Sequence, residues 1–313
     1  MTSYIIRRLL VAIPTLLVVL TLVFLLVRVA PGDPATAVLG QQASREAIEN
    51  LRTKMGLDKP LWKQYFDYLT GLVHGDLGKS LISRRPVGSQ VLHALPFTLQ
   101  LTITGVLLGS LLGIPLGILT AVHRNAMLDY LGRIFSLAGL SIPAFYLGIL
   151  LMMAFSIQLS LLPTVGGGEQ GDIVDLLYHL VLPGLTLGLI MTAYVTRMTR
   201  SSILNILNQD YVSTARSKGL AERIVIYKHV LKNALVPILS VLGVYSIVLI
   251  GSSVMTEIVF SRPGLGKLMV MAMKQRDYLM LQSLLTVYAG LVVIINLFTD
   301  LSYGMVDPRV RYE

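Results

Sequence analysis

The stretch ALPFTLQLTITGVLLGSLLGIPLGILTAV, residues 94–122, decides the fold class of this 313-residue chain. It contains no charged side chain and no histidine. A helix of about 20 apolar residues crosses the roughly 30 Å hydrocarbon core of a bilayer. Gly109, Gly113 and Gly117 recur every four residues, a spacing that lets another helix approach closely. The stretch is therefore expected to be a membrane-spanning helix packed inside a bundle.

On either side of this stretch, five further uncharged runs are long enough to span a membrane. The six runs are Leu9–Val27, Ala94–Val122, Ile134–Gly168, Leu176–Thr196, Asn233–Thr256 and Tyr278–Thr299. The third run is expected to leave the membrane at Leu162–Pro163 and Gly166–Gly168. The first run exceeds the usual apolar length of a signal peptide, so we expect an uncleaved helix; cleavage near Ala35-Thr36-Ala37 is the alternative. These runs predict an all-α integral membrane protein with six transmembrane helices.

The composition supports this class and excludes others. Hydrophobic residues make up 54% of the chain and charged residues 14%, and the mean hydropathy of +0.71 excludes a disordered chain. The absence of cysteine excludes disulfides, thiolate metal sites and cysteine nucleophiles. A net charge of +9 would suggest nucleic-acid binding in a soluble protein. In so apolar a chain, lysine and arginine instead indicate which loops face the cytoplasm.

Basic residues set the expected orientation. The segment between Thr196 and Asn233 carries seven basic and two acidic residues, whereas Gly168–Leu176 carries three acidic and no basic residues. By the positive-inside rule the former faces the cytoplasm, and with six spans both termini do so too. Four basic residues of the last outer loop run against the rule, namely Arg262, Lys267, Lys274 and Arg276.

The polar segment 28–93 predicts two short helices outside the membrane. Ser44 caps the first and Gly56 ends it, while Pro60 opens the second. The single tryptophan, Trp62, lies on the apolar side of the second helix. This helix is expected either to rest at the outer membrane interface or to pack on the spans.

The sequence contains no complete motif for covalent chemistry. Gly78-Lys79-Ser80 resembles the end of a phosphate-binding loop, but the glycine required five positions earlier is Val73. The histidines are scattered without a second ligand at metal-binding spacing, and neither His-Glu-x-x-His nor Gly-x-Ser-x-Gly occurs. We therefore expect no catalytic residue, no metal and no cofactor bound by this chain.

The interiors of the six runs carry no Asp, Glu, Lys or Arg, although transporters coupled to ions usually need an ionisable side chain there. Glu257 and Asp300 lie at predicted span ends, where solvated or interfacial carboxylates are expected. Pairing of Asp300 with a base near Arg309 is the alternative. Energy for transport would then have to come from a partner.

The basic inner loop is the most informative segment; residues 210–237 read DYVSTARSKGLAERIVIYKHVLKNALVP. It predicts a helix ended by Gly219, a turn, and a second short helix in which Ile224, Tyr227 and Leu231 share a face. An exposed helical pair at the mouth of a bundle suits docking into a groove of a partner. A basic face near anionic lipid is the alternative on physical grounds.

This loop resembles the signature of inner-membrane permeases of ATP-binding cassette (ABC) importers, in particular the dipeptide, oligopeptide, glutathione and nickel branch. The signature reads Glu-Ala-Ala, three residues, Gly, nine residues, and Ile-x-Leu-Pro. Here Ser213-Thr214-Ala215 and Gly219 hold the first two places, and His229–Lys232 holds the last. Other segments that resemble this branch are Arg7-Arg8, Ile13-Pro14-Thr15, Pro31–Pro34, Gly56–Pro60, Gly75–Gly78, Arg84–Val87, Pro163–Gly166, Glu257–Phe260, Pro263–Gly266, Arg276–Tyr278 and Asp307–Tyr312. Arg262 and Leu279 depart from its usual Trp and Pro.

The resemblance implies the type I ABC importer permease fold. Residues 1–93 would form the first transmembrane helix and an extracytoplasmic helical loop, and residues 94–313 a five-helix core with the cytoplasmic coupling loop 197–233. The implied partners are a second homologous permease, two ATPase subunits that bind ATP and Mg, an extracytoplasmic binding protein, and membrane lipid, with no nucleic acid. The implied location is the bacterial plasma (inner) membrane.

The resemblance also assigns two sets of residues. Contact with an ATPase subunit is expected for Thr214, Ala215, Arg216, Lys218, Gly219, Leu220 and Glu222. A short outer element near the translocation path is expected to contain Phe260, Pro263, Gly264 and Gly266, with a purely structural turn as the alternative. Gly219 should occupy a turn that a Cβ atom would strain.

The expected function is ATP-driven, binding-protein-dependent import of dipeptides or oligopeptides, with glutathione-like peptides among the candidates. One alternative is a secondary transporter driven by an ion gradient. Another is an importer of the same family for nickel chelates or sugars, and a third is a membrane scaffold that transports nothing.

Overall fold

A computed structural model describes residues 2–29, 33–39, 43–169 and 171–306, and the described chain is helical without a named strand. The Asp307–Tyr312 motif and Pro31-Gly32 lie outside the described residues. By compactness the chain divides into a first unit, Met1–Leu9, Phe97–Pro263 and Ile294–Glu313, and a second unit, Leu10–Pro96 and Gly264–Val293. The expected division between residues 93 and 94 stays a prediction.

Five described helices are long and apolar enough to cross a membrane, and a bent helix pair at 127–158 makes a sixth span if it crosses as one broken span and not as a re-entrant loop. The five are α1 (Thr2–Val29), α5 (Val87–Val122), α8 (Ile173–Leu207), α11 (Leu231–Val259, extended by preceding turns) and α13 (Tyr278–Val306). They confirm the five corresponding runs predicted from the sequence.

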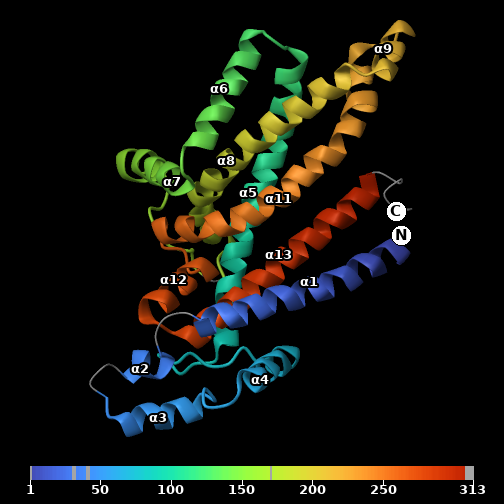
Figure 1. The fold of residues 1–313 in the computed structure, drawn as a ribbon. Coiled ribbons are helices and arrows are strands. Elements are labelled where there is room, and N and C mark those ends of the chain that lie inside the picture. Colours follow the sequence, from blue (N-terminus) through green and yellow to red (C-terminus); the bar gives the residue numbers. More distant parts are fainter. Residues whose placement is uncertain (1, 30–32, 40–42, 170, 307–313) are drawn as a thin grey trace. The chain divides into compact units, whose positions relative to one another are not determined.

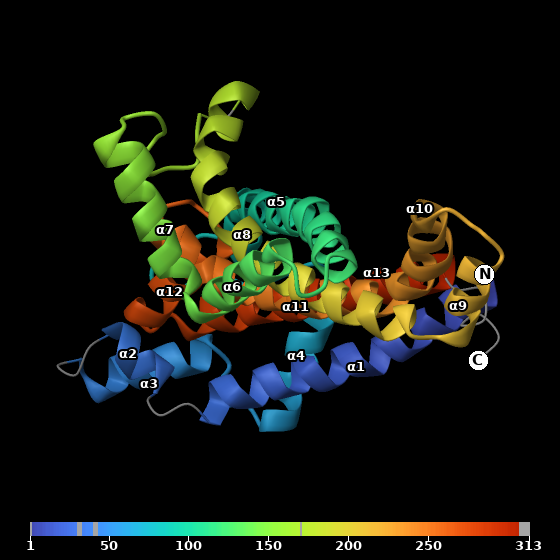
Figure 2. The same cartoon turned by 90° about the horizontal axis from the view of Figure 1, so that it is seen from above.

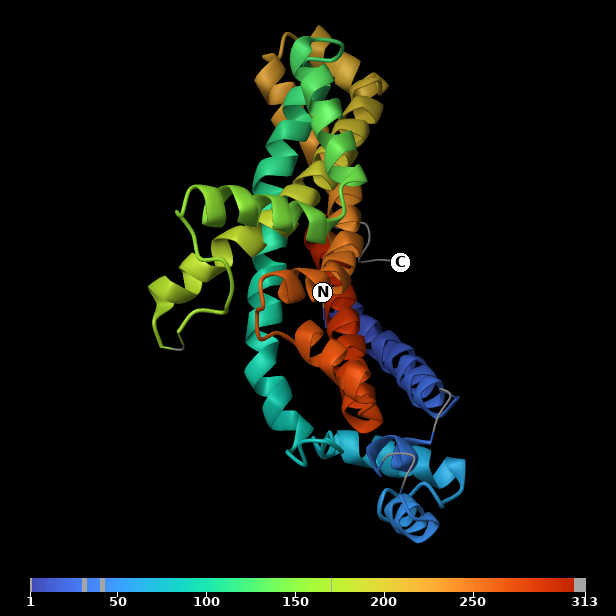
Figure 3. The same cartoon turned by 90° about the vertical axis from the view of Figure 1, so that its left-hand side faces the viewer.

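The third predicted run, Ile134–Gly168, is not a straight span. It contains the end of α6 (Met127–Ser141), then α7 (Ala144–Met152) and a π-helical turn, η1 (Met153–Gln158). The two halves meet at 103° (Figure 3). Ile142 is extended, with φ −89° and ψ 121°, because the residue before a proline is disfavoured in the helical region and Pro143 follows it.

In the first unit, α8 is the central helix, with α6, α7 and α11 packed against it (Figure 1). The small residues of α5 meet α8 as predicted. A Cβ atom added to Gly109 would lie 2.1 Å from Met191 Cγ, and one added to Gly117 would lie 2.5 Å from Thr199 Cβ. Glycine at these positions therefore sets how closely the two helices approach.

The helical pair of the basic inner loop has its own apolar core. It comprises α9 (Asp210–Ser217), α10 (Glu222–Ile224) and the π-helical turn η2 (Val225–Val230), which lie together in Figure 2. The buried side chains of this core come from α5, α8, α9, η2 and α11, and include Ile118, Ile203, Val212, Val225, Val230 and Ile238. The pair is thus seated on the ends of the spans.

Asp300, near the end of α13, accepts a hydrogen bond from Arg8 of α1. The Arg8 Nη1 to Asp300 Oδ2 distance is 3.0 Å, and both side chains are about one-third exposed. Tyr4 Oη also donates to the Asp300 carbonyl at 2.8 Å. The carboxylate lies at a span end as expected, and its ion-pair partner among the described residues is Arg8; Arg309, the base named in the alternative, lies outside them.

The second unit contains α2 (Pro34–Leu39), α3 (Arg45–Lys54), α4 (Leu61–Val73) and α12 (Leu265–Gln275). The two short helices predicted within residues 28–93 are confirmed as α3 and α4, and their location outside the membrane stays a prediction. Ser44 caps α3 by accepting the Ala47 N–H at 3.2 Å, and Gly56 follows it with φ +67°. Helix α2 was not predicted, because six residues give no periodicity.

Helix α4 packs on the end of α1 through aromatic rings. The Phe24 ring lies 5.3 Å from that of Tyr65 and 5.9 Å from that of Tyr68. Trp62 and Phe66 point elsewhere and are 66% and 59% exposed. Of the two alternatives for this helix, packing on a span is therefore confirmed through Tyr65 and Tyr68, while Trp62 itself stays exposed.

The Gly78-Lys79-Ser80 segment has a structural role in the second unit. Ser80 Oγ donates to Asp277 Oδ2 at 2.5 Å, and both side chains are buried. The same carboxylate accepts the backbone N–H of Leu81 at 3.2 Å and that of Met280 at 3.1 Å. Asp277 thus fixes this loop to the start of α13.

Candidate functional site

The turn between α9 and α10 is built around Gly219. Lys218 ends α9, and Gly219 has φ +75°, a left-handed conformation that side chains with a Cβ atom disfavour. No neighbouring atom lies within 4 Å of an added Cβ. The predicted strain is therefore confirmed, and its source is the backbone alone.

Arg216 and Glu222, which flank this turn in the sequence, form an ion pair. Arg216 Nη2 lies 2.6 Å from Glu222 Oε1, and Arg216 Nε lies 3.1 Å from Oε2. This bidentate contact raises the pKa of the Arg216 guanidinium above its usual value. Both side chains stay half-exposed, so the pair shapes the turn more than it stabilises the fold.

Six of the seven residues assigned to the coupling loop are exposed, namely Thr214, Arg216, Lys218, Gly219, Leu220 and Glu222. Ala215 differs, because it is buried in the apolar core beneath α9. Ala215 packs α9 against that core. The six exposed residues form the accessible surface of the turn.

The predicted apolar face of the second short helix is only partly right. Leu231 packs against the core, but Ile224 and Tyr227 are 45% and 57% exposed, and Val225 and Ile226 take the buried positions. Val225 and Val230, the first and last residues of the π-helical turn η2, are both buried, and a 3.6-residue period does not anticipate their five-residue spacing. Ile224 and Tyr227 therefore add apolar surface beside the basic turn.

A buried polar network closes the other end of α5, α8 and α11. Glu257, at the end of α11, has no exposed surface, and Thr98 Oγ1 donates to its Oε1 at 2.6 Å. The expectation of a solvated or interfacial carboxylate is wrong for Glu257. The sequence shows only that Glu257 lies near a span end, whereas α5 folds over it and supplies the hydroxyl.

Arg262 is the second buried ionisable residue of this network. Its Nη1 donates to the His179 carbonyl at 3.2 Å, and its Nη2 donates to Gln100 Oε1 at 3.0 Å. The guanidinium also lies over the Phe97 ring at 5.5 Å. Burial lowers the pKa of Arg262 to about 10, and the nearby Glu257 opposes that shift.

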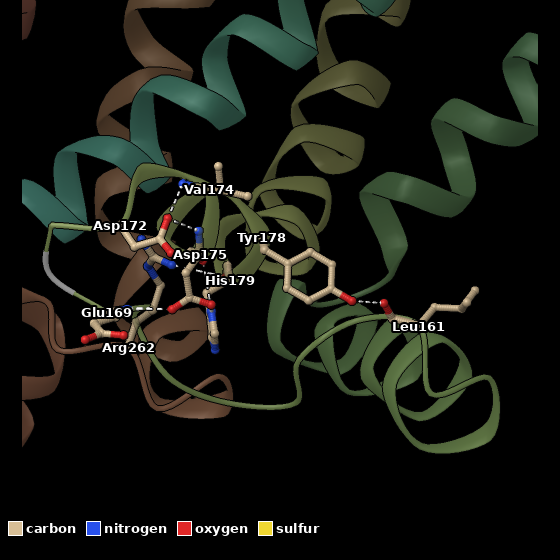
Figure 4. A network of polar contacts seen from close by, with 8 residues as sticks. All are labelled: Leu161, Glu169, Asp172, Val174, Asp175, Tyr178, His179 and Arg262. Carbon is tan, nitrogen blue, oxygen red and sulfur yellow. Dashed lines mark hydrogen bonds and ion pairs between the residues drawn. The ribbon is translucent and has the colours of Figure 1, made fainter.

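Figure 4 shows how Arg262 meets the start of α8. Asp175 Oδ1 lies 3.2 Å from His179 Nδ1, and Asp175 Oδ2 accepts the Glu169 backbone N–H at 2.6 Å. The Tyr178 hydroxyl donates to the Leu161 carbonyl. These contacts fold the acidic loop before α8 onto the segment that follows α11.

The residues assigned to the outer element fall at a helix junction. Phe260 is buried after α11, and its carbonyl accepts the Gly166 N–H at 2.8 Å. Pro263 lies so close to Gly167 that an added Cβ would come within 2.8 Å of Pro263 Cδ. Gly264 precedes α12, and Gly266 is buried in its first turn. Within the first unit, Phe260 and Pro263 thus hold the loop of Gly166 and Gly167.

A pocket of about 240 Å³ lies beside the bend between α6 and α7. Pro143 lines it at the bend, and Met191, Tyr194 and Tyr245 line it from α8 and α11. The rings of Tyr194 and Tyr245 have centroids 3.8 Å apart. This pocket combines apolar walls with two phenol groups.

Clustered metal ligands are not found in the described part of the chain: no three His, Asp or Glu side chains come together. The buried ionisable side chains of this network, Glu257 and Arg262, contact hydroxyl, amide and carbonyl groups instead. These contacts serve packing within the first unit.

Long apolar helices, one broken span and a helical loop between two spans define a multi-pass membrane protein. Residues 1–102 match the family described as "Binding-prot-dependent transport system membrane comp, N-term", and residues 113–312 match "Binding-protein-dependent transport system inner membrane component". The chain belongs to this family, the permease subunits of ABC importers.

Relatives and solved structures agree with this assignment. The chain is 42% identical to the glutathione transport system permease protein GsiC of Pectobacterium atrosepticum, and 41% identical to that of Escherichia coli K12, over the full length of each. Two inward-facing structures of the MetNI methionine ABC transporter share the fold. Their TM-scores are 0.55 and 0.56, with 20% and 19% identity, and they cover 69% and 70% of this chain and 96% of theirs.

Sequence reasoning missed three features of these sites. They are the bend at Pro143, the Tyr194–Tyr245 pair and the burial of Arg262. The Ile142-Pro143 step could have indicated the bend, since such a step favours extended backbone. No local sequence pattern indicates the Tyr194–Tyr245 pair or the burial of Arg262, because the residues in contact are far apart in the sequence.

Proposed function

We propose that this chain is one of two homologous permeases of an ATP-driven importer for dipeptides, oligopeptides or glutathione-like peptides. The supporting observation is 42% identity over the full length to a glutathione transport permease. The complete importer would add two ATPase subunits that bind ATP and Mg and a binding protein outside the membrane. The permease would lie in the bacterial inner membrane with both termini in the cytoplasm, as the charge of the 197–233 segment favours.

The turn around Gly219 is the proposed site of coupling to an ATPase subunit. Thr214, Arg216, Lys218, Leu220 and Glu222 would contact the partner, and Ala215 would hold α9 against the spans. Because α9 and η2 share one apolar core with the ends of α8 and α11, a push on the turn would reach both spans. The permease itself would need no catalytic residue.

The outer residues and the pocket at the α6–α7 bend are proposed parts of the translocation path. Phe260, Pro263, Gly264 and Gly266 would shape its outer end. The pocket beside Pro143 offers apolar walls and phenol hydroxyls that suit a peptide. The alternative for the outer residues is a purely structural junction.

Site-directed crosslinking tests the proposed coupling turn, and the natural chain helps because it contains no cysteine. Leu220→Cys should crosslink to an ATPase subunit in membranes that contain the whole importer. Lys63→Cys, on the exposed side of α4, is the matched control and should give no such product. Equal products from both variants, or none from Leu220→Cys, would overturn the assignment.

Competition for uptake tests the substrate class. Labelled dipeptide uptake by the reconstituted importer should fall when unlabelled dipeptide or glutathione is added. Nickel chelates and sugars should leave it unchanged. Competition by a chelate or sugar alone would favour the alternative importer of the same family.

A further inference from the structure

A polar pocket of about 340 Å³ lies in the second unit, between the end of α3, helix α4 and the first turns of α13. Its walls include Arg28, Lys54, Gln64, Tyr68 and Gln282. This volume falls at the lower end of small-molecule sites, which span roughly 300–1,000 Å³. Nothing derived above gives the pocket a role.

Gln64, which lines this pocket, carries an unpaired acceptor. Its side chain is buried, and its Nε2 donates to the Lys59 carbonyl at 2.8 Å and to the Leu57 carbonyl at 3.3 Å. These two acceptors fix the amide orientation, because the opposite one would place oxygen against both carbonyls. Oε1 of Gln64 therefore remains buried without a hydrogen-bond partner.

A second unpaired acceptor comes from α13 and an unpaired donor from α1. Gln282 is 5% exposed, and its Oε1 has no partner. Arg28 Nε is also buried without a partner, although the guanidinium lies over the Phe24 ring at 5.2 Å. All three residues line the same pocket. Buried polar atoms are rarely left unpaired, since each costs free energy.

Of the other charged groups at the pocket, Lys59 and Asp76 have partners, and Lys54 adds a positive charge to the wall. Lys59 Nζ lies 2.8 Å from Asp67 Oδ2, and Asp76 Oδ1 accepts the Gly78 N–H at 2.8 Å. The unmet demand is therefore specific: two amide oxygens need an N–H donor, and a guanidinium N–H needs an acceptor. A molecule with a positively charged donor at one end and a negatively charged acceptor at the other could pair with both kinds of atom.

We propose that this pocket binds a small zwitterion, a free amino acid or a dipeptide, with its ammonium on Gln64 and Gln282 and its carboxylate on Arg28. An ammonium supplies three donors, which exceeds the two unpaired oxygens. Charge-assisted contacts of this kind are the stronger hydrogen bonds of proteins. The site is additional to the translocation path proposed above and does not depend on it.

Calorimetric titration tests the proposal on the full-length permease, purified with its accompanying subunits in lipid nanodiscs. The probes are glycylglycine, N-acetylglycylglycine without an ammonium, and glycylglycinamide without a carboxylate. Glycylglycine should bind, and each blocked probe should bind about tenfold more weakly or worse, the loss expected for one charge-assisted contact. Equal binding of all three probes, or no binding of glycylglycine, would overturn the proposal.

Variants locate the site. Gln282→Met and Arg28→Met should each weaken glycylglycine binding by about tenfold or more. Gln90→Met is the matched control, because Gln90 also has a buried unpaired atom but does not line the pocket, and its affinity should stay within twofold. Unchanged binding in the first two variants, or an equal loss in the control, would contradict the assignment. A cryo-electron microscopy map with glycylglycine present that shows only ordered water in the pocket would do so too.

Discussion

Arg200 of α8 donates two parallel hydrogen bonds to the carboxylate of Asp129 of α6. The Arg200 Nε to Asp129 Oδ1 distance is 2.6 Å, and the Nη2 to Oδ2 distance is 2.9 Å. Asp129 has no exposed surface and also accepts the Asn125 N–H at 2.9 Å. The first half of the broken span is thus locked to the helix that leads into α9.

Removing Arg200 should destabilise the permease strongly. Arg200→Met leaves a buried carboxylate without its main partner, which costs about 3–5 kcal/mol. Thermal unfolding in detergent micelles, followed by far-ultraviolet circular dichroism, measures this loss.

Arg133→Met is the matched control for that variant. Arg133 Nε lies 3.7 Å from the same carboxylate, but its side chain is 42% exposed. The loss should therefore stay below about 1 kcal/mol. If both variants unfold at the same temperature, Arg200 is not the residue that locks α6 to α8.

Substitutions at Gly219 should separate backbone strain from side-chain size. Gly219→Val forces a β-branched residue into φ +75°, whereas asparagine tolerates this region. We expect Gly219→Asn to keep the uptake per ATP hydrolysed, and Gly219→Val to lower it. Both rates can be measured in proteoliposomes that contain the whole importer.

Gly78 provides the control for this experiment. It has the same φ of +75° and equally open surroundings, but it lies far from the coupling loop in the sequence. Gly78→Val should lower stability by a similar amount and leave the uptake per ATP unchanged. Equal uncoupling by Gly78→Val would show that Gly219 acts through general stability.

Thr98→Val should lower the stability of the buried network that contains Glu257 and Arg262. The variant keeps the shape of the side chain but removes the hydroxyl that donates to Glu257, at a cost of about 1–3 kcal/mol. Thr102→Val is the comparison, because the Thr102 hydroxyl donates only to the Thr98 carbonyl of its own helix at 2.9 Å. Thr102→Val should lose less in a thermal unfolding experiment. If Thr102→Val lost more stability than Thr98→Val, the Thr98–Glu257 hydrogen bond would not be an important contribution to stability.

The sequence predicts the spans well because the bilayer imposes a simple requirement of length and apolarity. It fails at the bend, since Ile134–Gly168 is uncharged throughout and prolines are tolerated in membrane helices. The glycine contacts of α5 were predictable, because their four-residue period lies within one helix.

The buried network was not predictable from local patterns. Thr98 and Glu257 are separated by 159 positions, and Arg262 and Gln100 by 162. A carboxylate at a span end looks solvated until the helix that covers it is known. The exposed turn at Gly219 was predictable, because glycine after a helix has a local conformational cause.

We expect this permease to move its substrate only when partner ATPases hydrolyse ATP. The most direct measurement is uptake of a labelled dipeptide into proteoliposomes that contain the whole importer and its binding protein. Uptake should require ATP, stop with vanadate and persist when an ionophore collapses ion gradients. Uptake by the permease alone, driven by an imposed ion gradient and abolished by the ionophore, would contradict the account.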